Sequence, residues 1–440
     1  MLSFLLLAAA IDGEAALRHA AALAALGPHP WGSPRTRAAA EYVAVQFREA
    51  GLEEVRLQDF ESQGIAGANV IGVLRSAGPD VVIVGAHHDT APEAPGAYDD
   101  GGGVGVLVEL ARAFAREPAR TRTFVFASFD GEEAWSTGKA TTAGSRAYVK
   151  SLGVDARRVA AAFVIEMCGW KGGTPVLHTI PYRDPRGTDR SVVTPAWLAR
   201  AALAGGGFRL GDPLLSWLYQ PALRAFRGEY YGDDLSFLQA GLPAVFVSDS
   251  SWSAFYPWYH AAGDTADKLD AAALARMGEA SLAVLRALDR APRGPAEEPQ
   301  WFAAFGYVIG APWLFALGLL SVLPGLGAAV RAGGVMLGAR LVHLLLFAYL
   351  LWRFPVPTLF AFLLANLLTV AGSRWLSLAS LLPSLALLVV GVLAWRRGAV
   401  DGIWLAPWEV AAVVFALVLV LVRGGPGGAR KGVRRRRVPA

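Results

Sequence analysis

The pattern of apolar and polar residues divides this chain into two parts. Up to residue 300, apolar runs are mixed with charged stretches, as in a water-soluble protein, whereas residues 301–423 are almost continuously apolar. Between them, residues 291–300 have the proline and glutamate content of a linker. The pattern therefore predicts four regions after an N-terminal segment: a folded domain (27–290), a linker (291–300), an apolar region (301–423) and a tail (424–440).

In the first part, short runs of β-branched and aromatic residues alternate with segments of helical spacing. The runs predict buried strands over residues 81–84, 123–128, 160–165 and 244–247. Helical spacing is found over residues 35–50, 105–115 and 268–288. Because strands and helices alternate, we expect an α/β fold with a mostly parallel (mixed) sheet that helices cover on both faces.

The first 26 residues allow two interpretations. Residues 1–10 are apolar and end in three alanines, which resembles a short signal peptide, although the basic start of such a peptide is missing. The same residues could instead be the first turns of a helix that continues through Leu26.

The apolar region has room for about five membrane spans. A hydrocarbon core about 30 Å thick needs about 20 apolar helical residues. Glycine, proline and arginine divide the region into residues 301–323, 335–352, 357–371, 375–395 and 403–422. The sequence therefore predicts an all-α transmembrane bundle after the α/β domain.

The net charge of +5 is a property of the tail. Six basic and no acidic residues lie in the last 17 positions, so the rest of the chain carries −1. This distribution does not favour a nucleic-acid partner. With five spans and a cytoplasmic tail, basic residues favour the cytoplasmic side, which places residues 27–290 outside the cytoplasm. We expect a multi-pass integral membrane protein in contact with the lipid bilayer, and its oligomeric state stays open.

Potential metal ligands follow the predicted strands on five separate segments. Imidazole nitrogen and carboxylate oxygen suit zinc, and five such ligands fit two ions that share one carboxylate and activate a water. Each residue alone has a plainer interpretation, such as a helix cap or a local hydrogen bond. Their coincidence in a chain with seven histidines indicates a metal site formed by His87, Asp99, Glu133, Glu166 and His260.

Two acidic residues fit roles beside these ligands. Asp89 lies two positions after His87, on the same face of the strand, and could orient the imidazole. Glu132 precedes the ligand Glu133 and could take a proton from the water and deliver it to a leaving amine.

The motifs that contain these residues resemble a known enzyme family. In order and spacing they are similar to the zinc aminopeptidases that include the bacterial leucyl aminopeptidases and the glutaminyl-peptide cyclotransferases. The resemblance covers about residues 25–290 and rests on GAHHD, PGAYDDGGGV, FDGEE, FVIEM, GDDLSFLQAGLPAV and YHAAGDTADKLD.

This resemblance implies an α/β metallopeptidase that removes N-terminal residues from peptides with two zinc ions. His87 and Glu166 would hold one zinc, Glu133 and His260 the other, and Asp99 would bridge them. It further implies that Glu132 is the general base, that Asp89 orients His87, and that Asp233 and Tyr259 contact the substrate.

The sequence departs from the family pattern at several positions. Glu166 stands where aspartate is usual, His88 where tyrosine is common and Asp234 where histidine is frequent; a ligand role for His88 is a minor alternative. The long loop over residues 134–143 resembles the cyclotransferases. Their single zinc would be held by Asp99, Glu133 and His260.

Two alternative functions follow. A glutaminyl-peptide cyclotransferase would form pyroglutamate with one zinc. A non-enzymatic receptor or scaffold is disfavoured, because all ligand positions are intact.

Overall fold

The computed structural model describes part of the chain: residues 11–117, 120–133, 142–179, 182–183, 191–211, 232–249, 256–295, 301–304 and 307–310. The chain divides into two units, residues 1–311 and 312–440. The second unit lies outside the described residues, as do most of the predicted membrane spans and the whole basic tail. The following paragraphs concern the first unit.

A mixed sheet of eight strands forms the centre of this unit, in the order β1-β2-β4-β3-β5-β10-β6-β9. Its four middle strands run parallel to one another. They are β4 (Thr123–Phe129), β3 (Val81–His87), β5 (Val159–Ile165) and β10 (Ala244–Asp249). The predicted α/β fold with a mixed sheet is confirmed, and each predicted strand is extended by one to three residues.

The edges of the sheet were not predicted. At one edge, β1 (Glu53–Ser62) and β2 (Ile65–Leu74) form an antiparallel hairpin, whose turn residues Gln63 and Gly64 both have positive φ angles. At the other edge lie β6 (Pro175–His178) and β9 (Arg209–Leu210). A separate small pair consists of β7 (Tyr182–Arg183) and β8 (Ser191–Val192).

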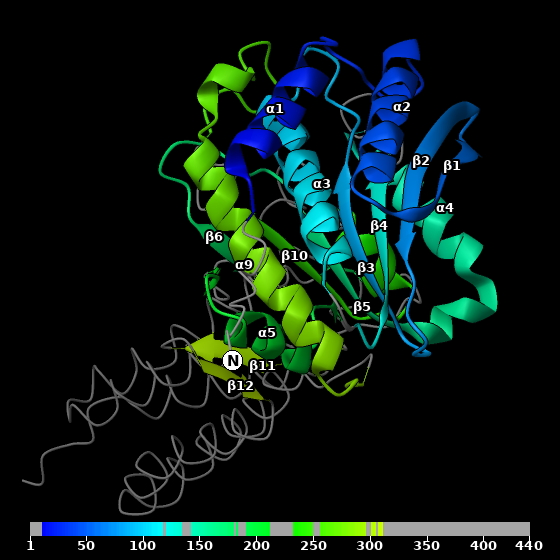
Figure 1. Ribbon diagram of the computed structural model, residues 1–440, viewed down its shortest axis with the longest axis vertical. Helices are drawn as coiled ribbons and strands as arrows, with labels where there is room; N and C mark the ends of the chain where they lie inside the picture. Colours follow the sequence, from blue (N-terminus) through cyan, green and yellow to red (C-terminus); the bar gives the residue numbers. More distant parts are fainter. Residues whose placement is uncertain are drawn as a thin grey trace, which may run out of the picture. The chain divides into compact units, whose positions relative to one another are not determined.

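Helices cover both faces of the sheet, because alternate residues of the buried strands point to opposite sides. Phe126 contributes to the core on one face and Val125 to the core on the other. The first face carries α1 (Gly13–Ala24), α2 (Pro34–Glu49), α3 (Gly102–Ala115), α5 (Ala196–Ala204) and α9 (Ala271–Arg290) (Figure 1). The second face carries α4 (Ala143–Leu152) and α7 (Asp234–Gln239). Short helical turns are η1 (Ala97–Gly101), η3 (Gly153–Arg158) and η4 (Ala266–Lys268).

Glycines at the start of α3 permit close approach of two neighbouring segments. A β-carbon at Gly102 would overlap the carbonyl oxygen of Cys168, which follows β5. One at Gly105 would overlap the carbonyl oxygen of Ala16 in α1. The glycine-rich run therefore brings η1, and the acidic residues within it, next to the end of β5.

Helix α9 runs along the parallel strands from their carboxyl ends to their amino ends. At its start, the backbone amide of Asp270 donates to the carbonyl of Gly169, just after β5. At its end, the carboxylate of Asp289 accepts hydrogen bonds from the amides of Thr121 and Arg122, just before β4. Its 20 residues span about 30 Å, so the chain leaves α9 on the side opposite the carboxyl ends of the strands.

The first half of the predicted linker is docked on the domain. The Arg122 guanidinium donates to the carbonyl of Ala291 at 2.7 Å, and the Trp197 indole donates to the carbonyl of Pro295 at 2.9 Å. Residues 291–295 therefore follow a fixed path rather than a free one.

Among the residues that the structure describes, no helix has the length and apolar content that a membrane span requires. The predicted spans over residues 335–352, 357–371, 375–395 and 403–422 lie outside these residues. The first predicted span begins differently from expectation. Trp301–Ala304 (β11) and Tyr307–Gly310 (β12) pair as antiparallel strands instead of a helix, which agrees with their aromatic and β-branched composition.

The buried aromatic residues of the sheet should dominate stability. We expect Phe126→Ala to lower the free energy of unfolding by about 3–5 kcal/mol, because the ring is fully buried and its removal leaves a cavity. Val154→Ala, at a residue that is 81% exposed, should change it by less than about 0.5 kcal/mol. Denaturant unfolding of both variants provides the measurement, and equal losses would contradict this view of the core.

Candidate metal centre

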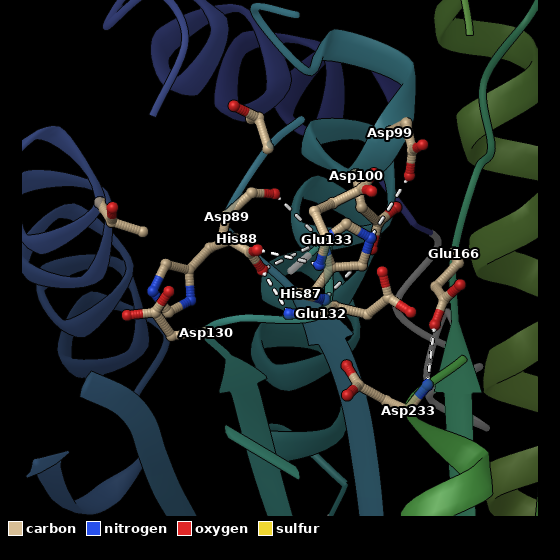
Figure 2. Close-up of polar contacts among 12 residues, drawn as sticks. His87, His88, Asp89, Asp99, Asp100, Asp130, Glu132, Glu133, Glu166 and Asp233 are labelled. Carbon is tan, nitrogen blue, oxygen red and sulfur yellow. Dashed lines mark hydrogen bonds and ion pairs between the residues drawn. The ribbon is translucent and has the colours of Figure 1, made fainter. Parts of the chain in front are cut away.

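The predicted ligands meet at the carboxyl ends of the parallel strands. β3 ends at His87, β4 is followed by the loop that contains Glu132 and Glu133, and β5 is followed by Glu166. Because these strands are adjacent and parallel, the three segments lie together at the carboxyl ends of the central strands (Figure 2). Asp99 comes to the same place from η1, and His260 from the loop before η4.

The carboxylate of Asp99 lies between two imidazoles. One oxygen, Oδ1, is 3.3 Å from Nε2 of His87, and the other, Oδ2, is 3.3 Å from Nε2 of His260. His260 Nε2 is also 2.9 Å from Oε1 of Glu133. A carboxylate that presents one oxygen to each of two imidazoles has the arrangement expected of a bridge between two metal ions.

Within the part of the chain that the structure describes, two groups of three residues have ligand atoms close enough to hold an ion. One consists of Asp99, Glu133 and His260, and the other of His87, Glu132 and Glu133. In each group the ligand atoms lie within 4.8 Å of one another. The donor set of imidazole and carboxylate suits a first-row divalent metal ion.

Asp89 holds this site together in two ways. Its main-chain carbonyl oxygen lies 3.1 Å from Nδ1 of His87, an arrangement that leaves Nε2 facing Asp99. Its carboxylate accepts hydrogen bonds of 3.0 Å from the backbone amides of both Glu132 and Glu133. The structure thus places the predicted orienting residue where it contacts both His87 and the loop after β4.

Glu166 and Asp233 form a neighbouring pair. The backbone amide of Asp233 donates to Oε1 of Glu166 at 3.2 Å, and Figure 2 shows both side chains beside that of Glu132. Glu166 belongs to neither three-residue group, so its role as a metal ligand stays a prediction. Tyr259 stacks on the ring of His260, with 3.6 Å between ring centroids.

His88 points away from the cluster. Its Nδ1 lies 2.9 Å from the hydroxyl oxygen of Ser128, and burial lowers its pKa to about 3. Asp234, at the start of α7, is buried. These contacts place His88 among packing residues rather than ligands.

Burial concentrates negative charge at this edge. Six of the predicted site residues are carboxylates with no more than 5% of each residue exposed, and only two are imidazoles. The six are Asp89, Asp99, Glu132, Glu133, Glu166 and Asp233. Buried charges are costly unless they are paired or coordinate a metal. A divalent cation would offset this excess, so the residues present fit a metal ion.

The pKa shifts follow from the same crowding. Burial raises the pKa of Glu133 to about 7, and burial together with the charge of Glu166 raises the pKa of Glu132 well above its ordinary value. Burial alone would lower the pKa of His260, but hydrogen bonds to Asp99 and Glu133 raise it to about 10. Positive charge is therefore favoured between these side chains.

Two residues that the sequence analysis did not single out position the ligands. Asp100 accepts hydrogen bonds from the backbone amides of His87, Gly103 and Met167, and so joins β3, α3 and the end of β5. Asp264 accepts from the amides of Tyr98 and Asp99 and from the hydroxyl of Tyr256. Asp100 lies in PGAYDDGGGV and Asp264 in YHAAGDTADKLD, but neither is one of the predicted metal ligands in these motifs.

Comparisons with known proteins indicate a peptidase family. Residues 69–285 match peptidase family M28. All predicted metal, catalytic and substrate residues lie within this M28 match. Over 262 residues the chain is 27% identical to the uncharacterized protein YfbL of Escherichia coli, covering 56% of this chain and 78% of that protein.

A shorter segment is 34% identical to the probable lipoprotein aminopeptidase LpqL of Mycobacterium tuberculosis. It covers 28% of this chain, but the chain spans only 23% of that protein's length.

Two solved structures share the fold. The zinc aminopeptidase BSAP of Bacillus subtilis has a TM-score of 0.50 at 15% identity, covering 62% of this chain and 94% of that one. The glutaminyl cyclase of Porphyromonas gingivalis also has a TM-score of 0.50, at 20% identity, with 63% and 99% covered. Since both activities occur on the same fold, the likeness alone does not choose between them.

Replacing Asp89 tests its positioning role. In Asp89→Asn, the amide group would face one of the two backbone amides that the carboxylate now accepts, which disturbs the Glu132–Glu133 loop. We expect zinc affinity to fall about 10–100-fold, as measured by competition with a chelator. Asp155→Asn, at an exposed side chain, is the control. Unchanged affinity in Asp89→Asn would show that the loop keeps its geometry without this carboxylate.

Proposed function

We propose that this protein is a zinc-dependent aminopeptidase anchored in a membrane. The observation that carries the proposal is the Asp99 carboxylate, which presents one oxygen to His87 and the other to His260. In this proposal Asp99, Glu133 and His260 would hold one zinc, and His87 and Glu166 would hold a second, with Asp99 as the shared ligand. The M28 match and the aminopeptidase named among the relatives support a metallo-exopeptidase.

Bound zinc would supply Lewis-acid chemistry, polarising a peptide carbonyl and lowering the pKa of a water molecule. Glu132 would act as the general base, because its buried carboxylate lies beside the predicted ligands and burial raises its pKa, which helps it to hold a transferred proton. It would accept a proton from the attacking water and donate it to the leaving amine. Asp233, beside Glu166, and Tyr259, beside His260, would contact the substrate.

One observation favours a glutaminyl-peptide cyclotransferase as a second candidate. Asp99, Glu133 and His260 form a complete three-ligand group without Glu166, which is enough for a single zinc. In that reaction the amino terminus of a glutaminyl peptide attacks its own side-chain amide, and ammonia leaves.

Metal content and product mass, measured on one purified full-length sample, separate these functions. The aminopeptidase predicts close to two zinc ions per chain and loss of one residue from a leucine-initiated peptide. The cyclotransferase predicts close to one zinc and loss of ammonia alone from a glutamine-initiated peptide. A zinc-loaded sample that changes neither peptide would refute both.

The role of Glu132 can be tested apart from metal binding. We expect Glu132→Gln to lower kcat/KM about 10²–10⁴-fold while zinc content stays the same, because the amide cannot accept the proton. Glu61→Gln, at an exposed residue of β1, should leave both unchanged. Because Glu132 also lies near His87 and Glu133, loss of zinc in Glu132→Gln would instead assign it as a ligand.

The membrane part of the proposal rests on the sequence. The apolar region 301–423 and the basic tail support a multi-pass anchor with the tail in the cytoplasm and the peptidase domain outside it, where peptides would be the substrates. An epitope placed after Ala440 should be accessible to antibody only in permeabilised cells. Accessibility in intact cells would reverse the proposed orientation.

A further inference from the structure

One turn of the domain presents an apolar side chain to solvent. Val154 lies in η3, just before β5, and 81% of the residue is exposed. Among the large apolar residues that the structure describes, only Val45 is also exposed, at 45%. A single exposed valine is ordinary by itself, so its surroundings decide whether it belongs to a binding surface.

Basic side chains are concentrated on this turn and on the segment beside it. Residues 150–158 and 286–295 present five exposed basic side chains and only one exposed acid, Asp155. Residues 1–423 as a whole carry a net charge of −1, so this concentration is local and does not follow from composition. The arginine surface, as we call it, consists of Val154 and the five basic residues Lys150, Arg157, Arg158, Arg290 and Arg293.

Hydrogen bonds hold the two segments of the arginine surface side by side. The guanidinium of Arg293 donates to the carbonyl oxygen of Arg157 at 2.5 Å and lies 3.9 Å from the carboxylate of Asp80. The guanidinium of Arg158 donates to the carbonyl oxygen of Pro79, just before β3, at 2.7 Å. The surface therefore joins the amino ends of β3 and β5 to the residues after α9, at the end of the strands opposite the predicted metal ligands.

Much of the positive charge on the arginine surface is not neutralised within the domain. The side chains of Lys150, Arg157 and Arg290 form no hydrogen bond or ion pair with any residue that the structure describes. The exposed acid, Asp155, lies 3.8 Å from Arg158. Three exposed cations are thus available to an external anionic partner.

We propose that the arginine surface docks on the anionic phospholipid headgroups of a bilayer. The proposal rests on the membrane anchor proposed above, but not on its orientation. Lipid phosphates would accept hydrogen bonds from Lys150, Arg157 and Arg290, and Val154 would enter the boundary between headgroups and acyl chains. Two observations favour a bilayer as the partner: an exposed apolar side chain lies among the cations, and the apolar region follows in sequence the residues that Trp197 holds at this end of the domain.

Docking can be measured on the full-length chain in nanodiscs of phosphatidylcholine, with or without phosphatidylglycerol. An environment-sensitive dye on Val154→Cys should brighten only in discs that contain phosphatidylglycerol. The one native cysteine, Cys168, is buried, and the dye-treated unaltered chain gives the background. The same dye on Glu93→Cys, at an exposed residue between β3 and η1, should respond to neither lipid. Equal signals from Val154→Cys in the two lipids would overturn the proposal.

Removal of charge tests whether the arginine surface itself causes docking. Each basic side chain near an anionic membrane contributes about fivefold to binding, so Arg157→Gln/Arg290→Gln should lower the ratio of docked to undocked protein about 25-fold. Folding should not change, because neither side chain has a partner among the described residues. Arg35→Gln, at an exposed residue of α2, is the matched control and should keep the ratio. An unchanged ratio in the double variant would reject the arginine surface as the docking site.

The proposed anchor and the proposed activity are tested separately. A full-length chain that alkaline washing strips from membranes would remove the anchor. Flotation of that chain with vesicles of the same two lipid compositions would then test the arginine surface. Binding to vesicles with phosphatidylglycerol alone would support docking, whereas equal binding to both or binding to neither would overturn it. Zinc content and peptide cleavage enter none of these measurements.

Discussion

The contact of one buried carboxylate with two imidazoles determines how the rest of this site is arranged. Asp99 can face both His87 and His260 only if η1, the end of β3 and the loop before η4 approach one another closely. Hydrogen bonds from two further aspartates hold these segments together. Asp100 fixes the amide of His87, and Asp264 fixes the amide of Asp99 from four residues beyond His260. The ligands are therefore positioned through backbone hydrogen bonds rather than by their own side chains alone.

Burying so many carboxyl groups at the candidate metal site costs free energy of folding. A buried carboxylate without partners opposes folding, and hydrogen bonds from backbone amides offset this desolvation cost at several of these residues. Asp89, Asp100 and Asp264 each accept at least two such bonds, which partly offset the cost of burying their carboxyl groups and hold the neighbouring loops. Burial raises the pKa of Glu132, Glu133 and Glu166 above the ordinary value, and this favours a nearby cation or a bound proton at their oxygens.

The sequence was most informative where a single local pattern was decisive. The continuous apolar runs of β3, β4, β5 and β10 could be recognised because strands buried on both faces need such runs. The hairpin β1–β2 was missed, because β1 is largely exposed and its alternation is broken by charged residues such as Asp59. For this hairpin, the Gln63–Gly64 turn was a signal that could have been used.

The segments that carry the candidate ligands could be located from the sequence because they follow predicted strands, and their role as ligands stays a prediction. The residues that hold these segments in place could not be located in this way. Asp264 contacts Asp99 across 165 positions of sequence, and nothing local marks it. Asp89 was expected to orient His87, but its carboxylate also binds the loop after β4, a contact that only the fold creates. The beginning of the apolar region was misjudged for a related reason, since a short aromatic and β-branched run fits a strand as well as a helix.

The direction of α9 also determines at which end of the domain the chain leaves it. The helix begins beside the metal ligands and ends about 30 Å away, where Arg122 and Trp197 secure the residues that follow it. A bilayer or a solid support joined to the chain beyond Pro295 would therefore attach at the amino ends of the parallel strands, remote from the predicted ligands. The candidate metal site and the point where the chain leaves the domain thus lie at opposite ends of the 20-residue helix α9.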